Sequence, residues 1–189
     1  MTDASPNAAR ATILGVLTPH GDGATVHFER MYATSAADLW SGITSPDRLK
    51  GWLGTLTGDL TVGGRYRIAM SDEPDSENKS TGEVLVCDEP RRLVVTWDFP
   101  GEGTSELEAI VAESGGGAAL VLDHRGLNRA QARDYGAGWH TYLDDLGTAL
   151  AGGTAQDWNG RFERVLPDYQ AQLPKDEDPA EATPSPEEA

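Results

Sequence analysis

A long amphipathic segment near the C-terminal end constrains the fold of this chain most. It runs from Asn128 to Gly152, and its large apolar residues recur at steps of three and four. That spacing places them on one stripe of an α-helix, with Asn128 as the N-cap and Gly152-Gly153 as the stop. The stripe consists of Tyr135, Trp139, Tyr142, Leu143, Leu146 and Leu150. A helix with one apolar face must bury it, so the rest of the chain is expected to supply a matching surface.

Two glycines interrupt this helix at Gly136 and Gly138, just before Trp139. Each costs about 1 kcal/mol relative to alanine in a helix interior. We interpret them as positions where another segment approaches the backbone closely, or where space is left open above the helix.

Period-two alternation predicts strands through most of the preceding chain. An opening pair at residues 11–18 and 24–32 flanks the turn signal Asp22-Gly23. Five further strand-like runs follow, over residues 56–70 with Gly63-Gly64 inside the run, and over residues 81–87, 92–99, 105–113 and 118–125. Strands joined by such short turns pair antiparallel. The predicted fold class is therefore α+β, a curved antiparallel sheet of six to seven strands wrapped round the long helix.

Three further helices are predicted. Residues 35–44 form the first, with Ser35 and Asp38 placed as in a capping box. Residues 46–54 form the second, with Pro46 at the first helical position. The third is an accessory helix within residues 154–173, with a break near Pro167.

This pattern divides the chain into four parts. Residues 1–10 form a loose N-terminus, and residues 11–153 form the α+β domain. The accessory helix occupies residues 154–173. Residues 174–189 are rich in proline, alanine and glutamate without large apolar side chains, so we expect a disordered acidic tail.

The net charge limits the classes of partner. The 189-residue chain has a formal net charge of −16. Such a chain repels phosphate and anionic lipid, so neither nucleic acid nor a membrane surface is an expected partner. No run approaches roughly 18 apolar residues, and the N-terminus lacks a signal-peptide pattern, so we expect a cytoplasmic monomer or dimer. Cys87 is the only cysteine, which excludes an intrachain disulfide.

Inward-facing residues of the sheet and the helix are expected to line a cavity. Apolar walls with a few polar tips are typical of a small-molecule pocket, and an enclosed void of roughly several hundred Å³ is expected. The candidate lining residues are Trp52, Tyr66, Ile68, Trp97, Leu122, His124, Trp139 and Leu143. Of these, His124 and Tyr66 are the candidates for acid–base chemistry.

Other titratable groups are interpreted as solvated. His140 is predicted to point away from the inner stripe, and Asp144-Asp145 to lie on the outer side of the helix. The sequence has no HxxxH or CxxC pattern for a metal and no GxSxG nucleophile motif. No metal or cofactor is expected.

The order of these motifs resembles a known family. The likeness covers about residues 24–151 and is carried by Phe28-Glu29-Arg30, Ala37-Asp38-Leu39-Trp40, Thr44-Ser45-Pro46-Asp47-Arg48-Leu49, Gly51-Trp52-Leu53-Gly54, Gly63-Gly64-Arg65-Tyr66-Arg67, Gly82-Glu83-Val84, Pro90-Arg91-Arg92-Leu93, Thr96-Trp97, His124-Arg125-Gly126-Leu127, Gly138-Trp139 and Leu143-Asp144-Asp145-Leu146. In these features the chain resembles the family related to the activator of heat-shock protein 90 ATPase, within the START-like (polyketide cyclase and birch-allergen-like) superfamily. The resemblance implies a helix-grip fold, commonly with a cavity between sheet and helix.

Three functions stay open at this point. The favoured one is a module that binds a hydrophobic or aromatic small molecule in the cavity. The second is a co-chaperone-like or regulatory protein-interaction module, for which the chaperone or regulator is the partner. The third and least favoured is a cyclase- or hydratase-type enzyme that uses His124 and Tyr66. A fold of this kind hosts many activities, so the resemblance does not choose among them.

Overall fold

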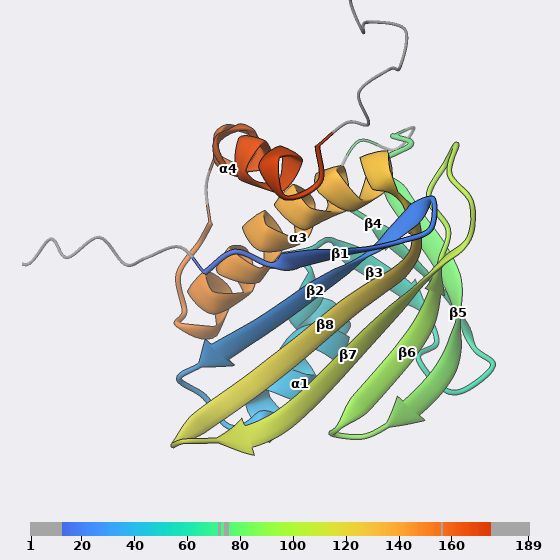
Figure 1. Ribbon diagram of the computed structural model, residues 1–189. Helices are drawn as coiled ribbons and strands as arrows, with labels where there is room; N and C mark the ends of the chain where they lie inside the picture. Colours follow the sequence, from blue (N-terminus) through green and yellow to red (C-terminus); the bar gives the residue numbers. More distant parts are fainter. Residues whose placement is uncertain (1–12, 72, 74–75, 156, 175–189) are drawn as a thin grey trace, which may run out of the picture.

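Eight antiparallel strands form one curved sheet in the computed structural model, in the order β1-β2-β8-β7-β6-β5-β4-β3 (Figure 1). The structure describes residues 13–71, 73, 76–155 and 157–174. The strands are β1 (Val16–His20), β2 (Gly23–Tyr32), β3 (Thr55–Gly58), β4 (Arg65–Ala69), β5 (Lys79–Asp88), β6 (Arg92–Trp97), β7 (Ser105–Ser114) and β8 (Gly117–Asn128). The α+β fold class is thus confirmed, and the loose residues 1–10 and most of the acidic tail lie outside the described residues.

The strand count is slightly higher than the six to seven predicted. The additional strand is β3, which has only four residues and pairs with β4. Extended chain was predicted up to Val62, but β3 ends at Gly58 and residues 61–63 form a bend and a turn. A strand this short contains too few alternating positions to be separated from the following turn by pattern alone.

Four helices complete the described part of the fold. They are α1 (Ala36–Thr44), α2 (Pro46–Leu49), α3 (Arg129–Leu150) and α4 (Trp158–Gln172). Asp38 N donates to the Ser35 side chain at 3.1 Å, as the predicted cap requires. The second helix is shorter than predicted, because regular α-helix ends at Leu49 and turns follow.

The long helix α3 has the predicted ends. Asn128 and Gln131 form a reciprocal capping box, in which each side chain accepts from the other residue's backbone N–H. The helix stops before Gly152, whose φ of +77° lies in the left-handed region that glycine adopts readily. In Figure 1 the sheet curves round α3, and α4 packs on α3 from the side away from the sheet.

α4 is continuous, so the break predicted near Pro167 is wrong. Proline removes one helical hydrogen bond, but the residue that follows it by two positions is strongly anchored. Tyr169 is fully buried, its hydroxyl accepts from Gly15 N at 2.9 Å, and its ring lies 6.2 Å from that of Phe28. Gln172 adds two hydrogen bonds to the chain just before and within β1. These contacts hold the last turns of α4 against the body of the fold.

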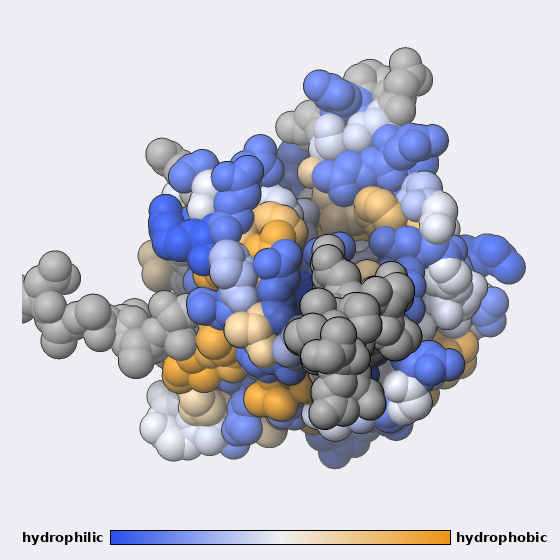
Figure 2. Space-filling model, turned by 45° about the horizontal axis from the view of Figure 1, so that its top comes forward, coloured by the Kyte–Doolittle hydropathy of each residue, from blue (hydrophilic) through white to orange (hydrophobic). Residues whose placement is uncertain are grey.

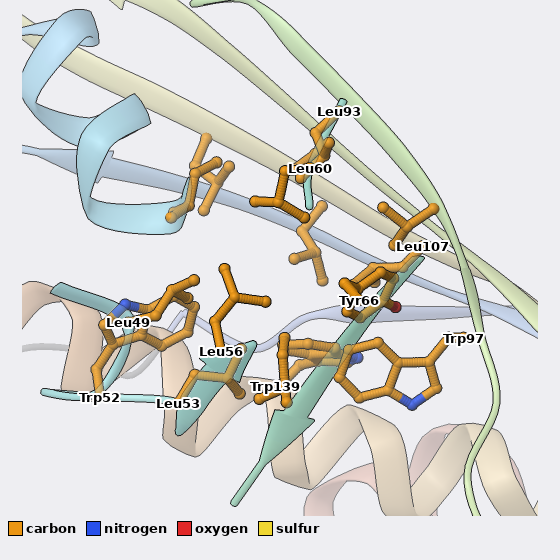
Figure 3. A pocket seen from close by; sticks show the side chains of 16 residues that line it. Leu49, Trp52, Leu53, Leu56, Leu60, Tyr66, Leu93, Trp97, Leu107 and Trp139 are labelled. Atoms are coloured by element: carbon orange, nitrogen blue, oxygen red, sulfur yellow. The ribbon is translucent and has the colours of Figure 1, made fainter. Parts of the chain in front are cut away.

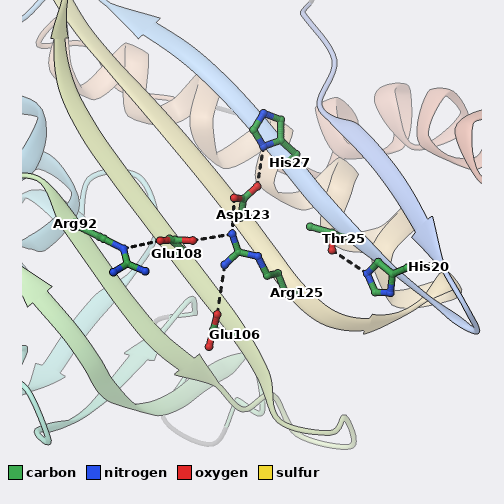
Figure 4. A network of polar contacts seen from close by, with 8 residues as sticks. All are labelled: His20, Thr25, His27, Arg92, Glu106, Glu108, Asp123 and Arg125. Atoms are coloured by element: carbon green, nitrogen blue, oxygen red, sulfur yellow. Dashed lines mark hydrogen bonds and ion pairs between the residues drawn. The ribbon is translucent and has the colours of Figure 1, made fainter.

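The two faces of the sheet differ in character. Alternate residues of β8, among them Leu120, Leu122 and His124, are buried inward. On the outer face Arg125 pairs with Asp123 at 2.7 Å and with Glu108 at 2.7 Å (Figure 4). This ion-pair network, which extends to Arg92, Glu106 and His27, lets the outer face lie uncovered.

The surface is mostly hydrophilic. Figure 2 shows hydrophilic residues over most of one face, with apolar residues gathered in separate patches between them. No helix among the described residues is long and apolar enough to cross a membrane.

The two glycines of α3 have opposite surroundings. A Cβ at Gly136 would lie 2.6 Å from the Tyr169 ring, whereas a Cβ at Gly138 would meet nothing within 4 Å. We therefore expect Gly138→Ala to stabilise the protein by about 1 kcal/mol, through helix propensity. Gly136→Ala is expected to destabilise it by about 1–3 kcal/mol, through overpacking against a clamped ring. Denaturant unfolding of the two variants tests this, and equal signs would contradict the assignment.

Candidate functional site

An apolar cavity lies between the concave side of the sheet and α3. Its volume is about 60 Å³, and the lining side chains converge on it from the sheet, α1, α2 and α3 (Figure 3). Every lining side chain is aliphatic or aromatic: Ile43, Leu49, Trp52, Leu53, Leu56, Leu60, Tyr66, Ile68, Leu93, Val95, Trp97, Leu107, Ala109, Leu120, Leu122 and Trp139. The cavity is much smaller than the several hundred Å³ expected from the sequence. The reason is the bulk of its walls, in which leucines and aromatic rings fill most of the space.

The polar tips of the cavity's aromatic residues all hydrogen-bond within the protein. Trp52 Nε1 donates to Gly42 O at 2.9 Å, and Tyr66 Oη donates to Thr96 O at 2.7 Å. The indole N–H groups of the two remaining tryptophans bond at 3.1 Å, Trp97 to Tyr135 Oη and Trp139 to His124 Nδ1. Because each donor is already used, the cavity offers apolar surface and aromatic faces but no spare N–H or O–H group among these four side chains.

The structure brings six of the eight sequence-predicted residues together around the cavity. These are Trp52, Tyr66, Ile68, Trp97, Leu122 and Trp139. Leu143 is buried in the core, where its carbonyl accepts from Tyr32 Oη at 3.0 Å, but it does not line the cavity. His124 is also buried, behind Trp139 and outside the lining. The rings of Trp97 and Trp139 pack edge to face, with centroids 5.4 Å apart.

The hydrogen bonds of His124 define its tautomer. An indole N–H can only donate, so His124 Nδ1 accepts from Trp139 and the neutral ring carries its proton on Nε2. Nε2 then donates to Ser105 Oγ at 2.8 Å, and Ser105 Oγ donates to Trp97 O at 3.0 Å. This is the wrong tautomer for a histidine that must remove a proton from serine. Burial also lowers the pKa of His124 to about 3, so the ring is a weak base at neutral pH.

The hydroxyl of Tyr66 also has a partner within the protein. Its hydroxyl is used in the bond to Thr96 O, and burial raises the pKa of Tyr66. The polar groups of His124 and Tyr66 therefore both hydrogen-bond to other residues of the protein, and no hydrogen bond joins the two side chains to one another. The arrangement favours binding over proton transfer. Among the residues that the structure describes, no group of histidine, cysteine or carboxylate side chains could hold a metal ion.

His140 and Asp145 are buried, so two sequence interpretations are wrong. His140 is 2% exposed and lies under α4, where Nδ1 is 2.9 Å from Tyr169 Oη. Asp145 is 4% exposed and pairs with Arg161 of α4 at 2.5 Å. Both predictions assumed that the outer side of α3 faces water. This side of α3 is covered by α4, which follows α3 in the chain. The pattern of apolar residues in α4 does not predict which surface α4 packs against.

The protein is expected to lose stability in acid as the pH falls below about 6.5, which is above the pH range in which carboxylates usually titrate. An unfolded histidine binds a proton near pH 6.5, whereas folded His124 does not until about pH 3. The unfolded state therefore binds more protons between these values, and stability falls as pH drops below 6.5. At pH 5 the loss from His124 is about 2 kcal/mol, and His140, whose pKa burial also lowers, adds to it in the same direction. Urea unfolding at pH 7.5 and pH 5 measures this, and an unchanged free energy of unfolding would contradict it.

The fold and the sequence both match a known family. The sequence profile described as "Activator of Hsp90 ATPase homolog 1-like protein" matches residues 33–151. No sequence among curated proteins gives a significant match.

Solved structures show the same fold. The crystal structure of CalU16 from Micromonospora echinospora has a TM-score of 0.71 at 26% identity, covering 85% of this chain and 98% of CalU16. A protein from Bordetella parapertussis has a TM-score of 0.65 at 24% identity, covering 92% of this chain and 96% of that one. DynU16, a protein of the dynemicin biosynthetic locus, has a TM-score of 0.63 at 22% identity, and the match covers 71% of this chain and 49% of DynU16. With more than half of its length matched, this chain belongs to the Activator of Hsp90 ATPase homolog 1-like family, and its domain is START-like.

Proposed function

We propose that this protein binds a small apolar molecule in the cavity between the sheet and α3. The observation that carries this is a void of about 60 Å³ whose lining is wholly aliphatic and aromatic. An apolar void of this kind stays dry, and filling it with a hydrocarbon or an aromatic ring gains dispersion contacts that water cannot supply. The START-like fold supports the proposal, because ligands of such folds commonly lie between sheet and helix.

The hydrogen bonding of the walls limits the chemistry of the ligand. A buried polar group costs free energy unless it finds a partner, and Trp52, Tyr66, Trp97 and Trp139 already use their donors internally. A ligand carbonyl, or the lone pairs of a ligand hydroxyl, would find no free donor among these four side chains. The inserted part is therefore a hydrocarbon or unsubstituted aromatic portion.

The size of the void limits the ligand as well. An engineered apolar cavity of about 150 Å³ holds benzene, and the present void is less than half of that. A ring therefore enters only if the wall yields. Leu60 is the wall residue best placed to move, since it lies between β3 and β4, outside regular structure, and is only partly buried. The ligand class is thus a slender chain or a single ring.

Filling the void is expected to abolish binding while preserving the fold. Ala109 lines the cavity from β7, so Ala109→Val places two further carbon atoms in it. The measurement is isothermal titration calorimetry with benzene, an unsubstituted single ring, as the probe. We expect Ala109→Val to weaken probe binding at least about tenfold, which is about 1.4 kcal/mol, and to leave the unfolding temperature unchanged or higher.

The matched control uses the same strand and the same substitution. Ala112 is exposed on the outer face of β7, so Ala112→Val should leave probe binding within about twofold of the original, well under 1 kcal/mol. The proposal fails if the original protein does not bind the probe, or if both variants bind it equally well.

A further inference from the structure

A second hollow, which we call the α3–α4 groove, lies beside the apolar cavity. Its volume is about 520 Å³, within the range of about 300–1,000 Å³ typical of small-molecule sites. Residues of α3, α4, the α2–β3 corner and the β4–β5 connection line it, and it shares only Trp52 and Leu53 with the cavity. The family profile matches residues 33–151 of this chain, and α4 follows that region. Part of the groove wall therefore comes from outside the matched region.

One stripe of α3 forms a side of the groove. Asp134, Gly138, Tyr142 and Asp145 lie on successive turns of the helix, at steps of four, four and three, and all four line the groove. A Cβ at Gly138 would meet nothing within 4 Å. The glycine therefore leaves room above the helix for another molecule, because no protein atom occupies that space.

Aromatic rings give the groove flat apolar faces. Trp158 and Phe162 of α4 stack with an interplanar angle of 14° and centroids 5.1 Å apart. The Tyr142 ring lies 5.1 Å from that of Trp158, at 44°. Trp52 and Phe99 also line the groove. Such rings favour a planar ligand, and their negative faces attract a cation.

The charges in the groove include one unpaired carboxylate. Asp145 is paired with Arg161 at 2.5 Å, and Lys50 contributes a positive charge from the end of α2. Asp134 is exposed at the edge of the groove and makes no hydrogen bond or ion pair with any residue that the structure describes. Partial burial raises its pKa, and the positive charge of neighbouring Arg133 acts in the opposite direction. A bound cation beside Asp134 would gain a direct charge interaction with this carboxylate. The chain's net charge of −16 also concentrates cations near its surface.

We propose that the α3–α4 groove is a second binding site, which takes a flat aromatic molecule bearing a positive charge. The ring system lies over Gly138 against Tyr142, Trp158 and Phe162, and the charge lies beside Asp134. This site does not depend on ligand binding in the apolar cavity, since the two sites have separate linings apart from Trp52 and Leu53.

The test is a fluorescence titration with ethidium, a planar cation, compared with neutral phenanthridine. Gly138→Leu fills the groove, and we expect it to weaken the binding of both probes at least about tenfold. Asp134→Asn is expected to weaken ethidium about fivefold or more, through loss of the charge interaction, and to leave phenanthridine within about twofold. Gly138→Leu adds its side chain to open space, and its unfolding temperature and circular dichroism verify that the fold is intact.

Glu29→Gln is the control for nonspecific attraction to an acidic protein. Glu29 is exposed on β2, which contributes nothing to the groove, and the variant changes the net charge by the same amount as Asp134→Asn. Ethidium binding within about twofold of the original in Glu29→Gln supports the site. Equal weakening in Glu29→Gln and Asp134→Asn, or full binding in a folded Gly138→Leu variant, would overturn the proposal.

Discussion

Trp139→Ala is expected to lower the free energy of unfolding by roughly 3–5 kcal/mol, the range for truncating a large buried aromatic residue. Trp139 is 3% exposed and packs edge to face on Trp97, at the contact between α3 and the inner face of the sheet. Its removal also takes away the donor to His124 Nδ1, leaving a buried acceptor unpaired at a further cost. Urea unfolding gives the value directly.

Trp139→Phe separates the two contributions. Phenylalanine keeps most of the aromatic contact but lacks the N–H group, so its cost should be about 1–3 kcal/mol and smaller than that of alanine. If Trp139→Ala instead costs below about 1 kcal/mol, as surface substitutions do, then α3 does not close the sheet through this residue.

Tyr169→Ala is expected to destabilise the protein by a similar amount, roughly 3–5 kcal/mol. Tyr169 is fully buried and joins three segments that are far apart in the sequence. Its hydroxyl accepts from Gly15 N and bonds with His140 Nδ1, each at 2.9 Å, and its ring packs on Phe28 and His140. Burial raises the pKa of Tyr169 to about 12, so the hydroxyl keeps its proton and can donate to His140 at neutral pH.

Tyr169→Phe is the matched variant for this site. It retains the ring but leaves Gly15 N and His140 Nδ1 without their partner, so a loss of about 1–3 kcal/mol is expected. The unfolding transition of both variants checks these values. A deletion of α4 that unfolds at the same denaturant concentration as the full chain would contradict the view that α4 is part of the folded core.

The sequence was sufficient for the main architecture because two periodicities coincide with burial. The spacing of apolar residues by three and four in residues 128–152 predicts α3 together with both of its ends. Alternation in β8 likewise predicts the face that carries Leu120, Leu122 and His124, which the structure places inward. The same alternation places Leu93 and Val95 beside Trp97 on the cavity wall, although the candidate residues did not include them. Period alone identifies a face but does not say which part of that face lies next to a void.

The remaining features depend on contacts between distant segments. Leu60 lines the cavity from a stretch without regular structure, so no periodic signal marks it. The burial of His140 and Asp145 depends on where α4 packs, and nothing in residues 158–172 alone specifies that surface. The cavity volume depends on side-chain packing at the scale of one methyl group, which a residue pattern does not encode.

The most direct measurement of the central claim is a crystal structure determined under xenon pressure. Xenon enters dry apolar cavities without needing a hydrogen-bond partner. The expected result is xenon density among Trp139, Leu122 and Ala109, inside the space between the sheet and α3. Side chains that fill this space with no xenon bound, or ordered water in it, would contradict an apolar binding cavity.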